Sequence, residues 1–356
     1  MHTEKMLPVK MTGGIYSECW HSYIVAALLS DDKFLPWFVE RFMDFYVSED
    51  CVGWYHIQNV ISGPYYEYEE VIDYQEIRDF SINPIQAIQE AIIRNRYVIS
   101  VYNFGGVLHE IMIIGYDAVG FRTYSIGLSR AVQDHISYET FLQNFTSALE
   151  ILEKNSKEYK YIYKFHMPLS SFGLKLEFHR AVRLERLEGT FYELHAAQKT
   201  IKVNKEGEQT ALYHGTSILD FLIRKLQDEF ENNESLARII RILFKLWETS
   251  EGLRFRVDYC TQRYAIDWEE TLPDDLKRLC DTVNLAKSYL IKYQMTRHKR
   301  LVSQATKKFL EIRDLEETVF WRLSVAMEHT LLQNIKKDAV DLLHAIHPDE
   351  ANTRLH

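Results

Sequence analysis

Cysteine is scarce in this chain, and its few cysteines are not grouped. Four cysteines stand among 356 residues, and no two of them form a CxxC pair or a zinc-type cluster. We therefore expect no metal site. The N-terminus also lacks the charged and then apolar pattern of a signal peptide, which predicts reduced thiols in a cytoplasmic protein. The four positions are Cys19, Cys51, Cys260 and Cys280.

Other signals are missing as well, and each absence removes a class of function. The sequence has no apolar run of roughly 18 residues, so we expect no transmembrane helix. The phosphate-binding patterns GxxxxGK[ST] and GxGxxG are both absent, and no cofactor is predicted. The formal net charge is −9, which argues against nonspecific binding to nucleic acid or to an anionic membrane surface. That charge permits a basic partner.

The composition is that of a folded protein with a large core. Hydrophobic residues make up 46% of the chain and aromatic residues 13%. The predicted secondary structure changes after Pro168. Helices and strands are mixed before this residue, and long helices dominate from about Thr216 onward. We therefore predict an α+β protein with a mixed domain over residues 1–167 and a mostly α-helical domain over residues 168–356. The helical part is predicted to include helices over residues 274–293, 297–312 and 315–346.

One cysteine stands where a nucleophile would be expected. Cys19 follows a polar, glycine-containing loop over residues 12–18 and opens an apolar helical run that ends near Leu29. The positive end of a helix favours thiolate over thiol, and thiolate is the reactive form. A buried structural cysteine is the competing interpretation, because free cysteine often serves as a small core residue.

The partner that a reactive cysteine needs is a histidine, and His109 is the candidate. A strand over residues 97–102, a turn at Gly105-Gly106 and a strand over residues 109–116 predict an antiparallel meander that continues into residues 121–124. His109 begins the second strand, at an end of the sheet where a side chain can face a cleft. Cys19 and His109 either form a catalytic pair or are structural residues that never meet.

Several short motifs follow one another in a particular order. Cys19 opens the first long helix, a helix-to-strand unit over residues 83–102 precedes His109, and a helix follows Ser137. In this arrangement, over roughly residues 6–166, the chain resembles the papain-like domain at the start of butirosin biosynthesis protein H and its relatives. That fold is also similar to the cysteine peptidase domains that remove leader peptides on bacteriocin exporters. The resemblance implies a papain-like N-terminal domain in which the helix that carries Cys19 packs on an antiparallel sheet.

The chain departs from this family at two positions of the site. The family usually has Asp or Asn one strand after the histidine, where this chain has Ser125, which can accept only a weak hydrogen bond from the ring. Asp117 lies roughly 26 Å from His109 along an extended strand, too far to pair with it. Residues 12–18 contain no Gln or Asn to donate to an oxyanion, which leaves the backbone N–H of Cys19 for that role. Other candidates for the third member are His21, Asp134 and His135.

The resemblance implies an acyltransferase of bacterial natural-product biosynthesis, such as antibiotic biosynthesis. Cys19 would take an acyl group from the thioester of an acyl carrier protein, and His109 would activate the thiol and then deprotonate a small-molecule amine acceptor. One alternative is a non-catalytic papain-like protein that binds a peptide or a carrier domain. Another alternative is a cysteine peptidase that acts on a precursor peptide. The short basic cluster over residues 297–300 fits either a docking patch for an acidic carrier protein or a solvated helix face.

Overall fold

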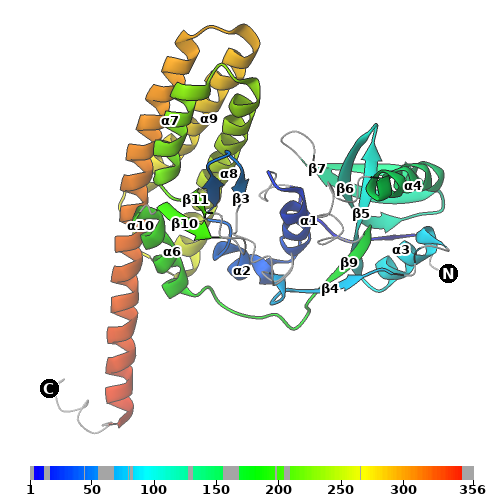
Figure 1. Ribbon diagram of the computed structural model, residues 1–356. Helices are drawn as coiled ribbons and strands as arrows, with labels where there is room; N and C mark the ends of the chain where they lie inside the picture. Colours follow the sequence, from blue (N-terminus) through cyan, green and yellow to red (C-terminus); the bar gives the residue numbers. More distant parts are fainter. Residues whose placement is uncertain are drawn as a thin grey trace, which may run out of the picture. The chain divides into compact units, whose positions relative to one another are not determined.

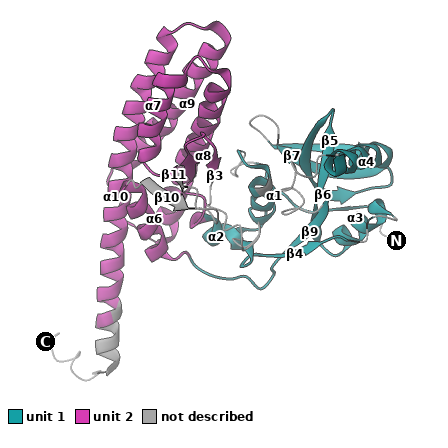
Figure 2. Cartoon of the chain, in the orientation of Figure 1, with its two compact units in different colours: residues 1–38, 58–181 teal, residues 39–57, 182–356 magenta. Residues whose placement is uncertain are grey.

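The protein is an α+β protein whose chain divides into two compact units. The computed structural model describes residues 4–11, 17–43, 45–54, 68–78, 80, 83–126, 131–154, 168–196, 199–203, 209–264 and 266–346. The first unit consists of residues 1–38 and 58–181, and the second consists of residues 39–57 and 182–356 (Figure 2). The first unit contains a large antiparallel sheet, and the second is mostly helical (Figure 1).

The sheet of the first unit is built around the predicted meander. Its strands run in the order β4-β9-β5-β6-β7-β8, and β1 pairs with β6. All of these pairings are antiparallel. The strands are β1 (Lys5–Met6), β4 (Ile72–Glu76), β5 (Arg96–Phe104), β6 (Val107–Tyr116), β7 (Gly120–Ile126), β8 (Ala131–Ser137) and β9 (Leu169–Leu174).

Helices cover both faces of this sheet. On β7, Tyr124 contacts Tyr23 of α1 (Cys19–Leu28), whereas Phe121 contacts Phe141 of α4 (Tyr138–Lys154). Residues three apart on a strand point to opposite faces, so α1 and α4 lie on opposite sides of the sheet (Figure 1). Among the described residues, the other helical segments that begin in this unit are η1 (Asp32–Phe34), α2 (Leu35–Val39) and α3 (Pro84–Ile93).

The predicted helix starts are confirmed in atomic detail. Asn83 caps α3 by accepting a hydrogen bond from the Gln86 N–H at 3.0 Å, with Pro84 as the first helical residue. Ser137 likewise accepts from the Thr140 N–H at 3.1 Å in front of α4. The strand β8 was not predicted. The aromatic sequence over residues 159–166 also predicts a strand, and these residues lie outside the described ones.

The second unit combines a small sheet with long helices. Its strands are β2 (Tyr46–Ser48), β3 (Gly53–Trp54), β10 (Lys199–Val203) and β11 (Gln209–Tyr213), in the order β10-β11-β2-β3. Its helices are α6 (Leu184–Ala196), α7 (Ser217–Glu229), α8 (Asn233–Tyr264), α9 (Leu272–Thr296) and α10 (Arg300–Ile346). The two helices predicted over residues 297–312 and 315–346 are one continuous helix, because no Gly or Pro interrupts the apolar pattern there.

Strand pairing corrects the predicted domain boundary. The first unit extends to residue 181 rather than 167, because β9 lies between β4 and β5 in the large sheet. Residues 39–57 belong to the helical unit, because β2 pairs with β11. Both pairings join segments that are far apart in sequence, and local composition does not report such contacts.

Candidate functional site

The helix α1 places Cys19 at its first position. Glu18 is the N-cap residue in an extended conformation, and the first helical hydrogen bond runs from the Ser22 N–H to the Glu18 carbonyl at 2.9 Å. The body of the helix is anchored, since residues 23–29 are buried. The thiol therefore stands at the positive end of a fixed helix and is only half-buried.

The structure brings Cys19 and His109 together. The Cys19 Sγ lies 3.0 Å from the His109 Nε2, within contact distance for a thiol and an imidazole. His109 sits near the start of β6, opposite Tyr102 of β5, and the turn between these strands is made by Gly105 and Gly106. Both glycines have positive φ values, 64° and 102°, which side chains rarely adopt. The predicted pair is thus confirmed as a spatial pair.

The orientation of the His109 ring is set by its neighbour and not by Ser125. The His109 Nδ1 lies 2.8 Å from the main-chain carbonyl oxygen of Glu110, while a carboxylate oxygen of the same residue is 3.9 Å away. Among the described residues, Ser125 makes no hydrogen bond to the ring, so the structure does not support its predicted role as third member. Ser125 lies on β7 opposite Val132. The carbonyl oxygen of the next residue already meets Nδ1, and a hydroxyl from the neighbouring strand is not needed there.

Sequence reasoning missed Tyr23, which contacts the same carbonyl group. The Tyr23 hydroxyl donates to the Glu110 carbonyl oxygen at 2.5 Å. Its side chain is fully buried and packs edge-on against Tyr124, with ring centroids 6.0 Å apart. The available signal was the spacing of four residues between Cys19 and Tyr23, which places both side chains on one helix face.

The other candidates for a third member have different partners. His21 is buried within α1, where its Nε2 lies 3.1 Å from a Glu18 carboxylate oxygen and its Nδ1 meets the Tyr68 hydroxyl. His135 lies 3.1 Å from the Asp117 carboxylate, at the other end of β6 from His109. The adjacent Asp134 accepts from the His135 N–H at 2.8 Å. None of these contacts involves the ring of His109.

The remaining thiols are core residues. Burial raises the pKa of Cys51 to about 11 and the pKa values of Cys260 and Cys280 to about 12. A thiol with such a pKa carries almost no thiolate at neutral pH. Cys260 and Cys280 are both buried and therefore serve as packing residues.

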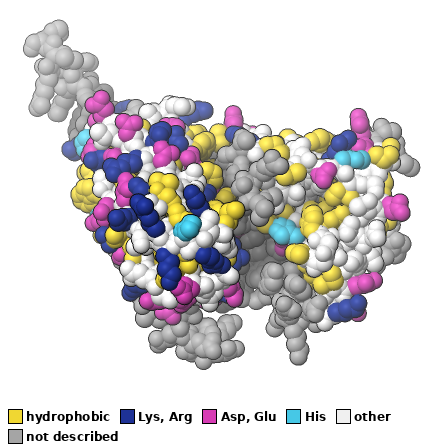
Figure 3. Space-filling model, turned by 90° about the horizontal axis from the view of Figure 1, so that it is seen from above, with side chains coloured by type: hydrophobic (Ala, Val, Ile, Leu, Met, Phe, Trp, Pro, Cys, Tyr) yellow, Lys and Arg dark blue, Asp and Glu magenta, His cyan; other side chains and the backbone are white. Residues whose placement is uncertain are grey.

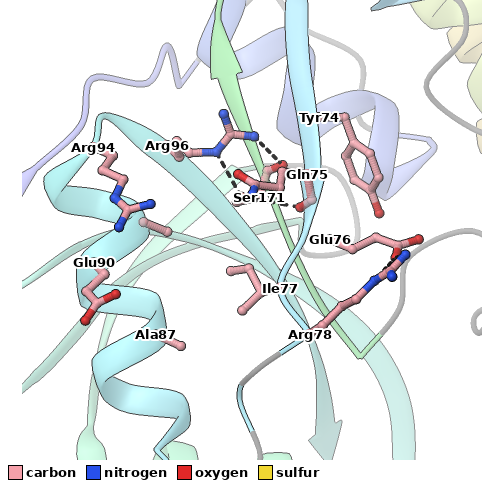
Figure 4. Close-up of a pocket in the computed structure, with 11 residues that line it drawn as sticks. Tyr74, Gln75, Glu76, Ile77, Arg78, Ala87, Glu90, Arg94, Arg96 and Ser171 are labelled. Carbon is pink, nitrogen blue, oxygen red and sulfur yellow. Dashed lines mark hydrogen bonds and ion pairs between the residues drawn. The ribbon is translucent and has the colours of Figure 1, made fainter.

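The first unit also contains a hollow of about 670 Å³ beside the edge strand β4 and the helix α3 (Figure 4). Three arginines line it, but two are already paired: Arg78 with Glu76 at 2.8 Å and Arg96 with Asp73 at 2.7 Å. Neither Cys19 nor His109 lines this hollow. It is therefore separate from the thiol–imidazole pair.

The predicted basic cluster lies where α9 meets α10, and part of its charge is neutralised. Arg297 donates to the Asn233 side chain, and Lys299 pairs with Glu231 at 2.7 Å. Lys and Arg side chains gather over the helical unit with Asp and Glu among them (Figure 3). This mixture favours the interpretation of a solvated surface over that of a strong anion site.

Two other kinds of functional feature are absent from the part of the chain that the structure describes. No group of three or more His, Cys, Asp or Glu in the described part of the chain is arranged to hold a metal ion. No helix among the described residues is both long and apolar enough to cross a membrane. In comparisons with known proteins, no family model and no curated protein matched the chain.

Proposed function

We propose that the first unit is a papain-like, cysteine-dependent acyltransferase of the butirosin biosynthesis protein H type. In this proposal it moves an acyl group from the thioester of an acyl carrier protein to a small-molecule amine, in the cytoplasm, as a step of natural-product biosynthesis. The observation that carries the proposal is the 3.0 Å distance between the Cys19 Sγ and the His109 Nε2.

In the first half-reaction Cys19 attacks the thioester carbonyl carbon. The His109 Nε2 takes the thiol proton as the new C–S bond forms, and the carbonyl oxygen becomes an oxyanion near the backbone N–H of Cys19 at the helix start. The C–S bond to the carrier then breaks, and the imidazolium returns its proton to the leaving thiolate. The products are an acyl-Cys19 thioester and the free thiol of the carrier.

In the second half-reaction an amine replaces the cysteine. The amine nitrogen attacks the acyl carbon, and the His109 Nε2 takes a proton from it. The tetrahedral intermediate collapses by breaking the C–S bond, and the Cys19 thiolate recovers the proton from the ring. An amide and the free enzyme result. A thioester is already an activated acyl donor, so a dyad suits this reaction better than it suits cleavage of an amide.

A trapping experiment tests this proposal. The full chain is incubated with an acyl N-acetylcysteamine thioester, without amine, and the intact mass is measured. We expect one added acyl group, located at Cys19 by peptide mapping and absent in Cys19→Ala. The matched control Cys51→Ala should acylate normally, because Cys51 is buried and its pKa is raised.

The other outcomes separate the alternatives. Failure of Cys19 to acylate, with the fold intact by circular dichroism, would leave the non-catalytic binding protein as the better proposal. Acylation followed by transfer only to water, together with cleavage of peptide amides, would favour the peptidase.

A further inference from the structure

One face of α1 makes two contacts with two consecutive residues of β6. Cys19 reaches the ring of His109, and Tyr23, one helical turn later, reaches the main-chain carbonyl of Glu110. Residues four apart on a helix lie above one another on the same face. The helix and the strand are therefore joined at two points, one of which is the thiol–imidazole contact itself.

The carbonyl oxygen of Glu110 is shared by two donors. It lies 2.8 Å from the His109 Nδ1 and 2.5 Å from the Tyr23 hydroxyl oxygen. A carbonyl only accepts, so Nδ1 must carry the proton. In a neutral ring this leaves the lone pair on Nε2, the atom that faces the Cys19 sulfur. That tautomer is the one that can take the thiol proton.

Tyr23 is a donor whose state does not change near neutral pH. Its side chain is buried, and burial, followed by the nearby Cys19 and Glu110, holds the pKa of its hydroxyl well above the usual value. The carboxylate of Glu110 is a weaker candidate for orienting the ring, since 3.9 Å exceeds the length of a hydrogen bond.

We propose that Tyr23 is a positioning residue that fixes the Glu110 carbonyl and thereby holds His109 in the tautomer and place that Cys19 requires. In this arrangement a tyrosine and a main-chain carbonyl together do what an Asp or Asn side chain does in other cysteine–histidine sites. The inference rests on the proposed function of the same site, because it concerns how the base is held.

The test compares Tyr23→Phe with Tyr97→Phe in the full chain. Tyr97 is the matched control, because it is also buried in the first unit and its hydroxyl also donates to a main-chain carbonyl, that of Pro8, at 2.6 Å. Tyr97 lies on β5, five residues or about 16 Å along the strand from the residue opposite His109. Both substitutions remove one buried hydroxyl and the hydrogen bond that it donates to a main-chain carbonyl.

The readout is the pH–rate profile for alkylation of Cys19 by iodoacetamide, with melting temperatures measured alongside. In Tyr23→Phe we expect Cys19 to react about fivefold to tenfold more slowly near neutral pH, with its pH–rate profile moved to higher pH. The reason is that, without the hydrogen bond from Tyr23, the Glu110 carbonyl holds the His109 ring less firmly in the orientation that accepts the thiol proton. Tyr97→Phe should keep the wild-type pH–rate profile, even if its melting temperature falls by as much as that of Tyr23→Phe.

Two results would overturn the inference. One is a Tyr23→Phe profile equal to that of the wild type. The other, measured on the wild-type protein by nitrogen NMR with labelled histidine, is a neutral His109 ring with its proton on Nε2. Either result leaves the proposed function standing if Cys19 is still acylated, whereas a wild-type Cys19 that does not acylate refutes the proposed function itself.

Discussion

Selective alkylation of one cysteine in the folded chain is the most direct consequence of the structure. None of the four cysteines forms a disulfide, but only Cys19 is half-buried beside an imidazole, and the other three are buried. We expect iodoacetamide at about pH 7.5 to modify Cys19 and to leave Cys51, Cys260 and Cys280 unmodified.

The size of this difference follows from the pKa values. An ordinary thiol has a pKa of about 8.5, so about a tenth of it is thiolate at pH 7.5. Burial raises the pKa of Cys51 to about 11 and those of Cys260 and Cys280 to about 12. The thiolate fraction then falls about 300-fold for Cys51 and about 3000-fold for the other two. Restricted access to buried sulfur slows their reaction further.

The assay is a time course of labelling, with each cysteine followed by peptide mass spectrometry. When Cys19 is fully labelled, less than about 1% of each other cysteine should carry the label. Labelling in denaturant should give four modified cysteines, and native Cys19→Ala should give none. Labelling of Cys51 or Cys280 at the rate of Cys19 would refute the burial argument, and an inert Cys19 would refute the assignment of the nucleophile.

Three further predictions concern stability. Gly120→Ala should destabilise the first unit by about 1–3 kcal/mol in urea unfolding, because the added Cβ would clash with the carbonyl of a residue on β8; an unchanged midpoint would contradict the close pairing. Arg256→Leu should destabilise the helical unit by at least about 2 kcal/mol, because the buried guanidinium donates to the carbonyls of Val39 and Arg41. Burial lowers the pKa of His214, so the unfolded chain binds the proton more readily, and stability should fall as pH drops through about 6.5. His214→Phe should flatten that part of the pH–stability profile, and a profile equal to the wild type would contradict the assignment.

The parts of the fold that could be predicted are those that local chemistry determines. Asn83 and Pro84 define the start of α3 through a side-chain cap and a fixed φ angle, and both act within one helical turn. The glycine turn at Gly105 and Gly106 determines the hairpin in the same local way, because both residues need positive φ. The residues alone left open whether Cys19 and His109 meet, the family resemblance implied that they do, and the structure brings the two side chains together.

What could not be predicted depends on contacts across the sheet. The observed domain boundary differs from the predicted one because β9 and β2 each pair with strands far away in sequence, and no local pattern specifies such partners. The third group of the site was sought among side chains, and Ser125 was chosen by its expected place one strand after His109. The structure instead uses the carbonyl of Glu110, a group that every residue possesses and that no sequence pattern marks.

The main-chain carbonyl of Glu110 beside the His109 Nδ1 affects which reactions the site can support. It fixes the ring tautomer as a carboxylate would, but it is a dipole and not a full charge, so it stabilises an imidazolium less. The carboxylate of Glu110 stands 3.9 Å from the same nitrogen and can add charge without a direct hydrogen bond. A base of this kind is suited to moving a proton between sulfur and a good leaving group, where the imidazolium is short-lived. Expulsion of an amine from an amide needs an imidazolium that persists until it protonates the leaving nitrogen. This difference supports the proposal of thioester chemistry over that of peptide cleavage.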